Sequence, residues 1–372
     1  MRIIFVNSAR GWAGGPTSGI ELGLGLAEKG HDVTLACHPD SAIHEQLESD
    51  PRLTLAPIAI RAELNPYRAG QLAVLNRRVK PDLVLADRRK DVKLSVMARV
   101  LSRGDFPIVH RHGAPSHLKD SRVYRYTWVR QVDAIIVNSH AMRDLLLERA
   151  PWLKHVTIHV IHNGKDPSRY RPLPKLRGRV RAELGIPEDA FVVSFHGVIQ
   201  ARKQIDALVR AVAALSPKLN VYALIIGSGP ATPELRRLTK ELRAPVVFAG
   251  LRTDIPEVLS AADAAAHLST AEGFSNSVLE SMACGLPMIV SNATSHPEQV
   301  EEGQQGVLVP PAQWEAVADA IRWLASDPEA RAQLGKAARE RVTKEFSRER
   351  MLERYEQTLR ETVKDHRSAS RD

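Results

Sequence analysis

The stretch EGFSNSVLESMACGLPMIVS, from Glu272 to Ser291, indicates both the fold and the site of this 372-residue chain. Two carboxylates, Glu272 and Glu280, lie eight positions apart, and Ser275 or Asn276 between them is a suitable helix N-cap. An amphipathic run follows, stops at a glycine, and gives way to an apolar segment that is typical of a buried strand. We therefore expect Glu272 in the loop before a helix and Glu280 about one turn inside it.

The predicted helix start suggests the chemistry of a ligand. A helix N-terminus presents free N–H groups and a partial positive charge to an anion. In this segment such a terminus is flanked by two carboxylates, which accept hydrogen bonds from hydroxyl groups. The pattern predicts a ligand that is part phosphate and part polyol.

Length and composition exclude several classes of protein. The chain is too long for one ordinary core, and its 44% hydrophobic and 26% charged residues are typical of a soluble protein with two domains. The opening apolar run, Ile3 to Val6, is far shorter than a signal peptide or a membrane span. Cys37 and Cys284 lie far apart and fit a reducing cytoplasm as small buried residues. We expect a cytoplasmic protein.

The net charge of +9 attracts phosphates of any kind, in nucleotides, nucleic acid or anionic lipid. Only 5% of residues are aromatic, and no basic–aromatic repeat of the RNA-binding kind occurs, so we expect no nucleic acid partner. Two basic runs stand out, Arg88 to Lys90 and Arg122 to Arg130. In the second run, Tyr124, Tyr126 and Trp128 alternate with cations. This run is either a solvated helix face or a peripheral contact with an anionic membrane.

Apolar strand-like runs and amphipathic helical runs alternate along the whole chain, which predicts parallel sheets covered on both faces. The segment from Asp166 to Arg181, rich in Pro, Arg and Lys, predicts an exposed linker. We therefore expect an α/β protein with two doubly wound, Rossmann-like domains, residues 1–165 and 175–346. Ligands of such sheets bind outside the carboxyl ends of the strands, which predicts a site in the cleft between the domains.

The segment Glu272 to Ser291 resembles the donor-binding motif of the retaining family-four glycosyltransferases, which have the GT-B fold. Further segments match that family in order and spacing, so that the resemblance covers nearly the whole chain. These are GHDV at 30–33, VIHNGKDPSRY at 160–170, GSGP at 227–230 and GLR at 250–252. The resemblance implies an acceptor-binding first domain, a donor-binding second domain, and a final helix, about 347–372, that crosses back to the first domain.

The resemblance also implies roles for individual residues. The implied catalytic residues are His112, Glu272 and Lys203, with His110 as the alternative to His112. The implied donor-binding residues are Gly14, Gly15, Gly197, Arg202, Lys203, Gly227, Gly250, Gly273, Phe274, Ser275, Asn276 and Glu280. Glu272 would orient the transferred sugar, and Glu280 would bind the ribose hydroxyls. The residues alone leave plainer readings open, namely a tight turn at Gly14–Gly15 and hydrogen-bonded loop histidines.

The segment GVIQARK, Gly197 to Lys203, departs from the family pattern Gly-Arg-x-x-x-x-Lys. Lys203 matches the final lysine, but Val198 stands at the arginine position. Arg202 is the candidate for the missing charge, although an α-helix would turn it about 100° away from Lys203. The valine at this position is the one feature of the sequence that favours the alternative of a non-catalytic subunit that binds a nucleotide sugar.

The resemblance implies a retaining, metal-independent glycosyltransferase that needs no cofactor. It would move a sugar from a nucleotide-diphosphate donor to a glycan, lipid-linked or small-molecule acceptor, in the synthesis of cell-surface polysaccharide or glycolipid. A nucleotide-sugar epimerase or hydrolase on the same fold, which would need no acceptor, is the second alternative. A glycosidase-type acid/base pair is rejected, because the two carboxylates flank a phosphate-binding type of helix N-terminus. The sugar, the base and the acceptor stay open.

Overall fold

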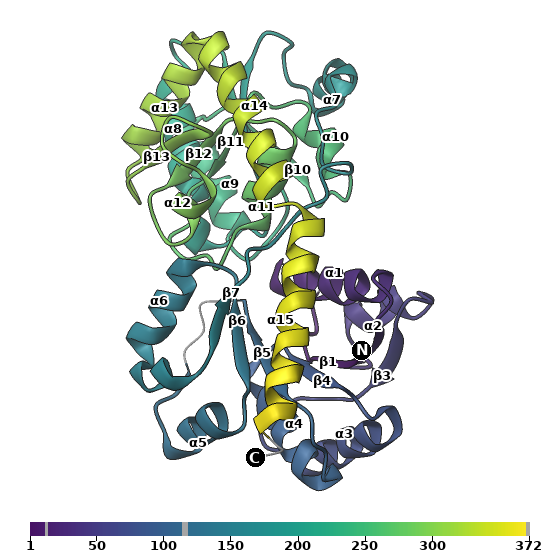
Figure 1. Cartoon of the computed structure of the whole chain (residues 1–372). Helices are drawn as coiled ribbons and strands as arrows, with labels where there is room; N and C mark the ends of the chain where they lie inside the picture. The colour runs from purple at the N-terminus through teal and green to yellow at the C-terminus, as the bar shows by residue number, and fades with distance from the viewer. Residues whose placement is uncertain (12–13, 114–117, 370–372) are drawn as a thin grey trace. The chain divides into compact units, whose positions relative to one another are not determined.

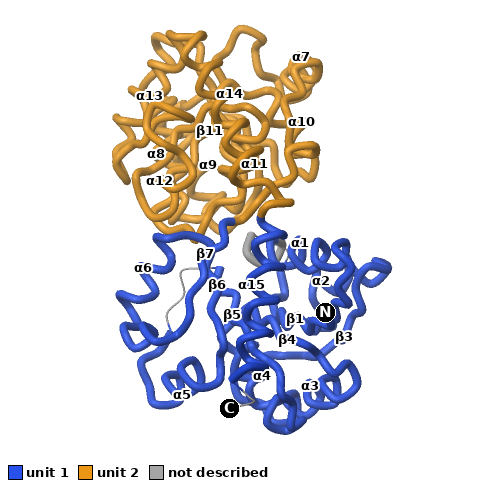
Figure 2. The backbone as a smooth tube through the Cα atoms, viewed as in Figure 1, with its two compact units in different colours: residues 1–162, 351–372 blue, residues 163–350 orange. Residues whose placement is uncertain are grey.

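The computed structural model describes residues 1–11, 14–113 and 118–369. The chain divides into two compact units, drawn in Figure 2: unit 1 comprises Met1–His162 and Met351–Asp372, and unit 2 comprises Asn163–Arg350. The sequence predicts domain limits at 165 and 175, whereas in the structure the residues between these limits belong to unit 2. Each unit has its own parallel sheet and its own hydrophobic clusters.

Within the described residues of unit 1, seven strands form one parallel sheet in the order β3-β2-β1-β4-β5-β6-β7 (Figure 1). The strands are β1 (Arg2–Asn7), β2 (Asp32–Cys37), β3 (Thr54–Pro57), β4 (Leu83–Ala86), β5 (Ile108–His112), β6 (Ala134–Val137) and β7 (Ile158–Val160). Helical crossovers join them, as parallel strands require. The helices are α1 (Gly14–Glu28), α2 (Ala42–Leu47), α3 (Pro66–Val79), α4 (Arg89–Ser102), α5 (Arg122–Arg130), α6 (His140–Arg149) and the 3₁₀ turn η1 (Pro151–His155).

Strand β1 shows why both faces of this sheet are buried. Its side chains point alternately to the two faces. Ile3 and Phe5 belong to one hydrophobic cluster, whereas Ile4 and Val6 belong to another, and all four are at most 1% exposed. The continuous apolar run of this strand is therefore the signature of a sheet with helices on both faces.

Helix α15 (Arg348–Ala369) brings the end of the chain onto the core of unit 1. Tyr355 and Leu359, one turn apart, belong to the same hydrophobic cluster as the inward residues of β1. The resemblance implies a final helix at about 347–372, and α15 is described up to Ala369. Its last turns are tied down by polar contacts, since Nδ1 of His366 lies 2.6 Å from a carboxylate oxygen of Asp133.

Helix α5 differs from the sequence expectation. Tyr124 and Trp128 are buried and stacked, with 5.0 Å between their ring centroids, whereas Tyr126 is 61% exposed. The three aromatic residues do not share a surface with the cations, because the helical period places positions 124 and 128 on one face, toward the core. No helix in the described part of the chain is long and apolar enough to span a membrane.

Unit 2, which is described throughout, has a six-stranded parallel sheet in the order β10-β9-β8-β11-β12-β13. The strands are β8 (Phe191–His196), β9 (Val221–Ile226), β10 (Val246–Gly250), β11 (Ala264–His267), β12 (Met288–Ser291) and β13 (Gly306–Val309). The α-helices are α7 (Arg177–Leu184), α8 (Ile205–Leu215), α9 (Thr232–Leu242), α10 (Ile255–Leu259), α11 (Asn276–Ala283), α12 (His296–Gln299), α13 (Trp314–Ser326) and α14 (Pro328–Glu345). Two 3₁₀ turns complete the unit, η2 (Pro174–Leu176) and η3 (Ala201–Lys203).

The two faces of the unit 2 sheet are covered by different helices. Val193 and Phe195 of β8 belong to a cluster that includes α8 and α13. Val192, on the opposite face, belongs to a cluster that includes α11 and α14. Both units are therefore doubly wound, as the alternation of strands and helices predicts.

The predicted linker is wrong in its second half, where α7 forms. Arg181, on this helix, is 1% exposed, and its guanidinium donates to the carboxylate of Asp263 at 2.9 Å. It also donates to four backbone carbonyls, those of Pro187, Glu188, Ala190 and Ala261. Composition suggests a solvated basic segment, but these acceptors satisfy the buried charge and fix the helix against the sheet.

Candidate functional site

Three polar residues end neighbouring strands of the unit 2 sheet. They are His196 at the end of β8, His267 at the end of β11 and Ser291 at the end of β12, and each is at most 3% exposed. The carboxyl ends of parallel strands meet at one edge, where α/β sheets bind their ligands. This edge, together with the N-terminus of α11, is the candidate site.

Helix α11 begins where the sequence predicts. Ser275 is its N-cap, and its hydroxyl accepts from the backbone N–H of Val278. The buried Gln299 holds the cap from the other side: it accepts from the N–H of Ser275 at 3.1 Å and donates to the carbonyl of Ser275 at 2.8 Å. Gln299 has no local sequence signal, because it lies 24 residues away from the cap that it supports.

The Asn-Gly turn of the motif at 160–170 supports the same loop. The side-chain amide of Asn163 donates to the carbonyl of Phe274 at 3.1 Å and to the side chain of Asn276 at 3.2 Å. A Cβ at Gly164 would lie 2.3 Å from the carbonyl oxygen of Ser347, so only glycine fits. The phenyl ring of Phe274 packs edge to face on Phe346 in the core. The turn therefore has a structural role within unit 2.

Glu280 is ionised and held on both of its oxygens. One oxygen lies 3.0 Å from Nζ of Lys165, the other 3.0 Å from Nε2 of His196, and the side chain is 12% exposed. Burial would raise the pKa of Glu280, but the charge of Lys165 and the hydrogen bond with His196 outweigh it and lower the pKa to about 2. Lys165 and His196 were not predicted as site residues, because they lie far from Glu280 in the sequence and leave no local signal.

Glu272 is the second ionised carboxylate, and two cations bind one of its oxygens. Arg202 donates to it at 2.8 Å, and Lys203 donates to the same oxygen. Burial would raise the pKa of Glu272, but the charges of Lys203 and Arg202 outweigh it and lower the pKa. Arg202 also donates to the carbonyl of Ala271 at 2.6 Å, which ties it to the loop before α11.

The expected divergence of Arg202 and Lys203 is wrong. The two residues lie in the 3₁₀ turn η3, and Gln204 after it has φ of 47°, so α8 begins only at Ile205. The α-helical angle between consecutive side chains does not apply, and both long side chains reach Glu272. Arg202 therefore brings a second positive charge to the site, although Val198 stands where the family pattern has arginine.

Three predicted site glycines, Gly197, Gly227 and Gly250, have a positive φ, which favours glycine. Gly197 and Gly227 have φ of 136° and 129°, and a Cβ at Gly227 would lie 2.1 Å from the carbonyl oxygen of Gly197. The N–H of Gly227 donates to the carbonyl of Gly250 at 2.7 Å, and Gly250 itself has φ of 69°. Gly273 lies buried in the loop before α11. The loops that follow β8, β9 and β10 thus meet closely at this edge.

In unit 1, the predicted His112 ends strand β5 and is 3% exposed. His110, the alternative candidate, lies on the same face of the strand. It accepts a hydrogen bond from the indole N–H of Trp128 at 3.0 Å, so it is part of the buried packing of unit 1. Helix α1 begins at Gly14, followed by Gly15, but residues 12–13 of the Gly-rich loop lie outside the described residues.

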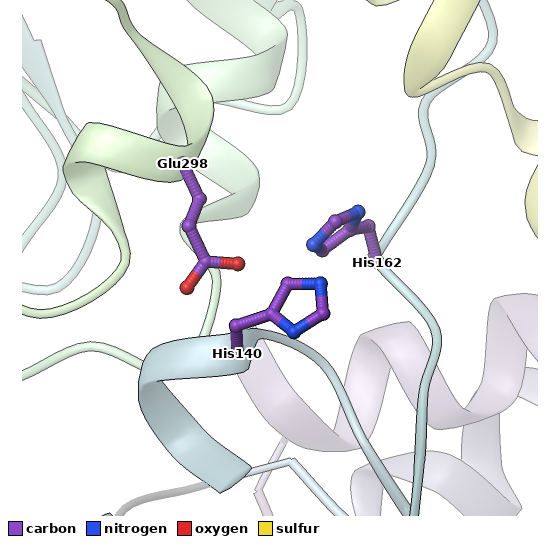
Figure 3. Close-up of side chains that lie close together, drawn as sticks. All are labelled: His140, His162 and Glu298. Atoms are coloured by element: carbon purple, nitrogen blue, oxygen red, sulfur yellow. The ribbon is translucent and has the colours of Figure 1, made fainter. Parts of the chain in front are cut away.

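Two further histidines of unit 1 meet at the start of α6. The rings of His140 and His162 lie edge to face, with 5.8 Å between their centroids (Figure 3). Glu298, the third side chain in that view, is on α12 and belongs to unit 2. Among the described residues, no three His, Cys, Asp or Glu ligand atoms close enough to share an ion come from a single unit.

Comparison with known proteins places the chain among glycosyltransferases. Residues 177–341 match the family "Glycosyl transferases group 1", and residues 12–169 match "Glycosyltransferase Family 4". D-inositol 3-phosphate glycosyltransferase of Saccharomonospora viridis is 35% identical over 229 residues, which are 57% of this chain and about half (52%) of that protein. N-acetyl-alpha-D-glucosaminyl L-malate synthase of Bacillus anthracis is 24% identical over 94% of both chains.

Solved structures show the same fold. Anabaena Alr3699/HepE, crystallised in complex with UDP, superimposes with a TM-score of 0.86 at 23% identity and covers 97% of this chain and 100% of its own. The two parallel-sheet units described above are therefore the two Rossmann-like domains of a GT-B fold.

The ionisation of Glu280 makes a prediction for stability against pH. Its pKa in the folded chain lies below its usual value of 4.5, so its contribution is complete above about pH 4.5 and is lost as the pH falls toward 2. We expect the unfolding free-energy difference between wild type and Glu280→Gln to shrink by about 2 kcal/mol from pH 7 to pH 3. Urea denaturation at the two pH values measures it. Glu241→Gln, on the exposed face of α9, is the control, and equal pH dependence of both variants would contradict the assignment.

Proposed function

We propose that this chain, a GT-B glycosyltransferase similar to family four, moves a sugar from a nucleotide-diphosphate donor to an acceptor, with retention of configuration. The observation that carries the proposal is the edge of the unit 2 sheet, where two ionised carboxylates, 13% and 12% exposed, flank the N-terminus of α11. Beside them lie two cations, Arg202 and Lys203. A nucleotide sugar needs both kinds of group, because it combines a diphosphate with hydroxyl-bearing rings.

In this proposal the cations and the helix stabilise the leaving diphosphate. As the glycosidic bond lengthens, charge grows on the phosphate oxygens. Arg202, Lys203, the N–H groups at the start of α11 and the backbone of Gly14–Gly15 would take up that charge. These fixed positive groups would supply what a divalent metal supplies in other transferases, so the proposed reaction needs no metal.

The two carboxylates orient the rest of the donor. An ionised carboxylate has about four acceptor positions, and the contacts of Glu280 with Lys165 and His196 use one on each oxygen. The remaining positions suit two neighbouring ribose hydroxyls. Glu272 would accept from hydroxyls of the transferred sugar, and His112 of unit 1 is the proposed second contact to that sugar. Attack from the same face, assisted by the leaving phosphate, would retain the configuration.

The acceptor is proposed at the level of class. Glycan, lipid-linked and small-molecule acceptors all fit a GT-B enzyme, in the synthesis of cell-surface polysaccharide or glycolipid. The names of the two relatives reported above contain D-inositol 3-phosphate and L-malate, which are both small anions. The net charge of +9 would attract acceptors of this kind electrostatically.

The geometry of Arg202 weighs against a non-catalytic subunit. The hypothesis of a non-catalytic subunit rests on Val198, which stands where the family pattern has arginine. Arg202 brings a positive charge to Glu272 instead. A nucleotide-sugar epimerase or hydrolase stays as the alternative that binds the same donor. Turnover of the donor that depends on an added acceptor excludes it.

We also propose a peripheral, cytoplasmic-side contact between α5 and an anionic membrane. The outward face of this helix carries Val123 and Tyr126, which are 56% and 61% exposed, and Val129, which is 37% exposed. Arg122 and Arg130 flank them, and α5 contains no acidic residue. Apolar side chains between arginines suit the boundary between headgroups and acyl chains.

The donor proposal predicts selective stabilisation by one nucleotide class. In a thermal-shift screen against UDP-, GDP- and ADP-sugars, we expect one class to raise the melting temperature of the wild type, because a ligand that binds the folded state stabilises it. Glu280→Ala should lose that shift, whereas Glu241→Ala should keep it. The absence of any shift at millimolar nucleotide sugar would overturn the proposal.

Because Arg202 and Lys203 bind the same oxygen of Glu272, we expect the substitution Glu272→Gln to affect the nucleoside diphosphate and the nucleotide sugar in opposite directions. Glu272→Gln releases Arg202 and Lys203 from a carboxylate, so the free nucleoside diphosphate should bind at least as tightly as it does to wild type. Transfer should nevertheless fall by about 100-fold or more, because the sugar loses an ionised acceptor. Calorimetry with the diphosphate and initial rates with the nucleotide sugar measure the two effects. Weaker diphosphate binding in Glu272→Gln would show that the carboxylate does not compete for the cations.

The membrane proposal predicts sedimentation with anionic vesicles. Wild type should sediment with phosphatidylglycerol vesicles and remain in solution with phosphatidylcholine alone, since both the arginines and the apolar face contribute. The double variant Val123→Ser, Tyr126→Ser should lose the interaction. Trp323→Ser, which removes an exposed aromatic residue from α13, is the matched control. Equal sedimentation of wild type and the double variant would rule out α5 as the contact.

A further inference from the structure

A buried chain of hydrogen bonds lies behind the loop that carries Glu272. Nδ1 of His296 lies 2.9 Å from the hydroxyl of Ser291, and that hydroxyl donates to the backbone carbonyl of Ser269 at 2.6 Å. The three residues are 0%, 1% and 1% exposed. Ser269 lies two residues after the end of β11 and precedes Glu272 by three positions, so the hydrogen-bond chain ends at the base of that loop.

The direction of these hydrogen bonds follows from their acceptors. Nδ1 of His296 also lies 3.2 Å from the backbone carbonyl of Ser291, and a carbonyl can only accept. Nδ1 therefore carries the proton. The hydrogen of the Ser291 hydroxyl is used on Ser269, so its oxygen accepts from His296. The order is fixed as His296 to Ser291 to Ser269.

His296 keeps this role over a wide pH range. Burial lowers the pKa of His296 to about 4, even though the nearby carboxylate of Glu272 opposes the shift. Its other ring nitrogen, Nε2, has no hydrogen-bond partner among the described residues. The hydrogen bonds that orient the imidazole are therefore those at Nδ1.

Ser269 connects the chain to both sides of the site. Its hydroxyl has one hydrogen to donate and two acceptors near it: the backbone carbonyl of Arg202 at 3.2 Å, and the carboxylate of Glu272, whose pKa it helps to lower. The next residue, Thr270, donates its N–H to the same carbonyl at 3.0 Å. The loop after β11 thus holds the 3₁₀ turn with the two cations and the carboxylate that they bind.

We propose that His296, Ser291 and Ser269 are positioning residues for transfer, which hold Glu272 and the Arg202–Lys203 turn in the geometry that meets the transferred sugar. This inference rests on the proposed function. It assigns the three residues to the rate of transfer rather than to donor affinity, because the contacts of Glu280, the proposed ribose ligand, lie outside the chain of hydrogen bonds.

The first test is Ser291→Ala, which removes the central hydroxyl. Misplacement of a reacting group by a fraction of an ångström to an ångström lowers rates strongly, so we expect kcat to fall about 10- to 100-fold with little change in KM for the donor. Ser194→Ala is the matched control, because Ser194 is also fully buried on a strand of this sheet and also donates to a backbone carbonyl, that of Ala264. It should keep the wild-type kcat. Equal kcat in wild type and Ser291→Ala, or equal losses in the two variants, would overturn the proposal.

The second test separates positioning from packing. In His296→Asn, the side-chain amide stands where Nδ1 stands and can donate to Ser291, whereas His296→Gln places its amide nearer the position of Nε2. We expect Asn to retain more kcat than Gln at equal melting temperature. The reverse order, or no difference, contradicts the assignment of the proton to Nδ1.

A third measurement does not depend on activity. The pKa of the Glu272 carboxyl, followed by ¹³C NMR in ligand-free protein, should rise in Ser291→Ala relative to wild type and stay unchanged in Ser194→Ala. If the wild type transfers no sugar, the proposed function fails, and this titration still decides whether the hydrogen-bond chain controls Glu272. An unchanged Glu272 pKa in Ser291→Ala, with wild-type turnover intact, rejects the positioning role alone.

Discussion

The site edge of unit 2 depends on the pairing of two largely buried carboxylates with four basic side chains. An isolated buried carboxylate costs several kcal/mol, which only well-placed cations and hydrogen bonds offset. Glu280 draws Lys165 from the segment after β7 and His196 from the end of β8, and Glu272 draws two cations from η3. Ion pairs and hydrogen bonds therefore hold separate stretches of the chain against α11 and the loop before it. The charges that would bind a ligand also shape the site.

Much of the fold is readable from the sequence because its signals are local. Apolar runs and amphipathic stretches predicted the alternation of strands and helices and two doubly wound units, since burial on both faces of a parallel sheet leaves a continuous apolar signature. The failures have a different cause. Arg181 looks like a linker residue, but its acceptors include the carbonyl of Ala261, 80 positions away. In α5 the alternation of Tyr124 and Trp128 with arginines is misleading, because a helix groups residues four apart, not two.

The site was partly predictable for the same reason. Cap chemistry is local, so Ser275, Glu272 and Glu280 could be placed around a helix start from sequence. Lys165, His196 and Gln299 could not, because each acts on a residue that only the tertiary structure brings near. One signal was available: His196, His267 and Ser291 are polar residues that end apolar strand runs. Whether such a residue faces a ligand edge depends on which strands are neighbours, and only the strand order supplies that.

Arg202 reaches the site from a position in the sequence where the family pattern has no arginine. The family pattern has an arginine directly after the glycine that follows β8, and here Val198 takes that position. Arg202 reaches Glu272 because η3 ends at Gln204 in a left-handed conformation before α8 starts. If the α-helix began four residues earlier, Arg202 and Lys203 would diverge by about 100°. The contact of Arg202 with Glu272 therefore depends on the turn η3. A substitution that lets α8 extend backward through Gln204 would break this contact without changing Arg202 itself.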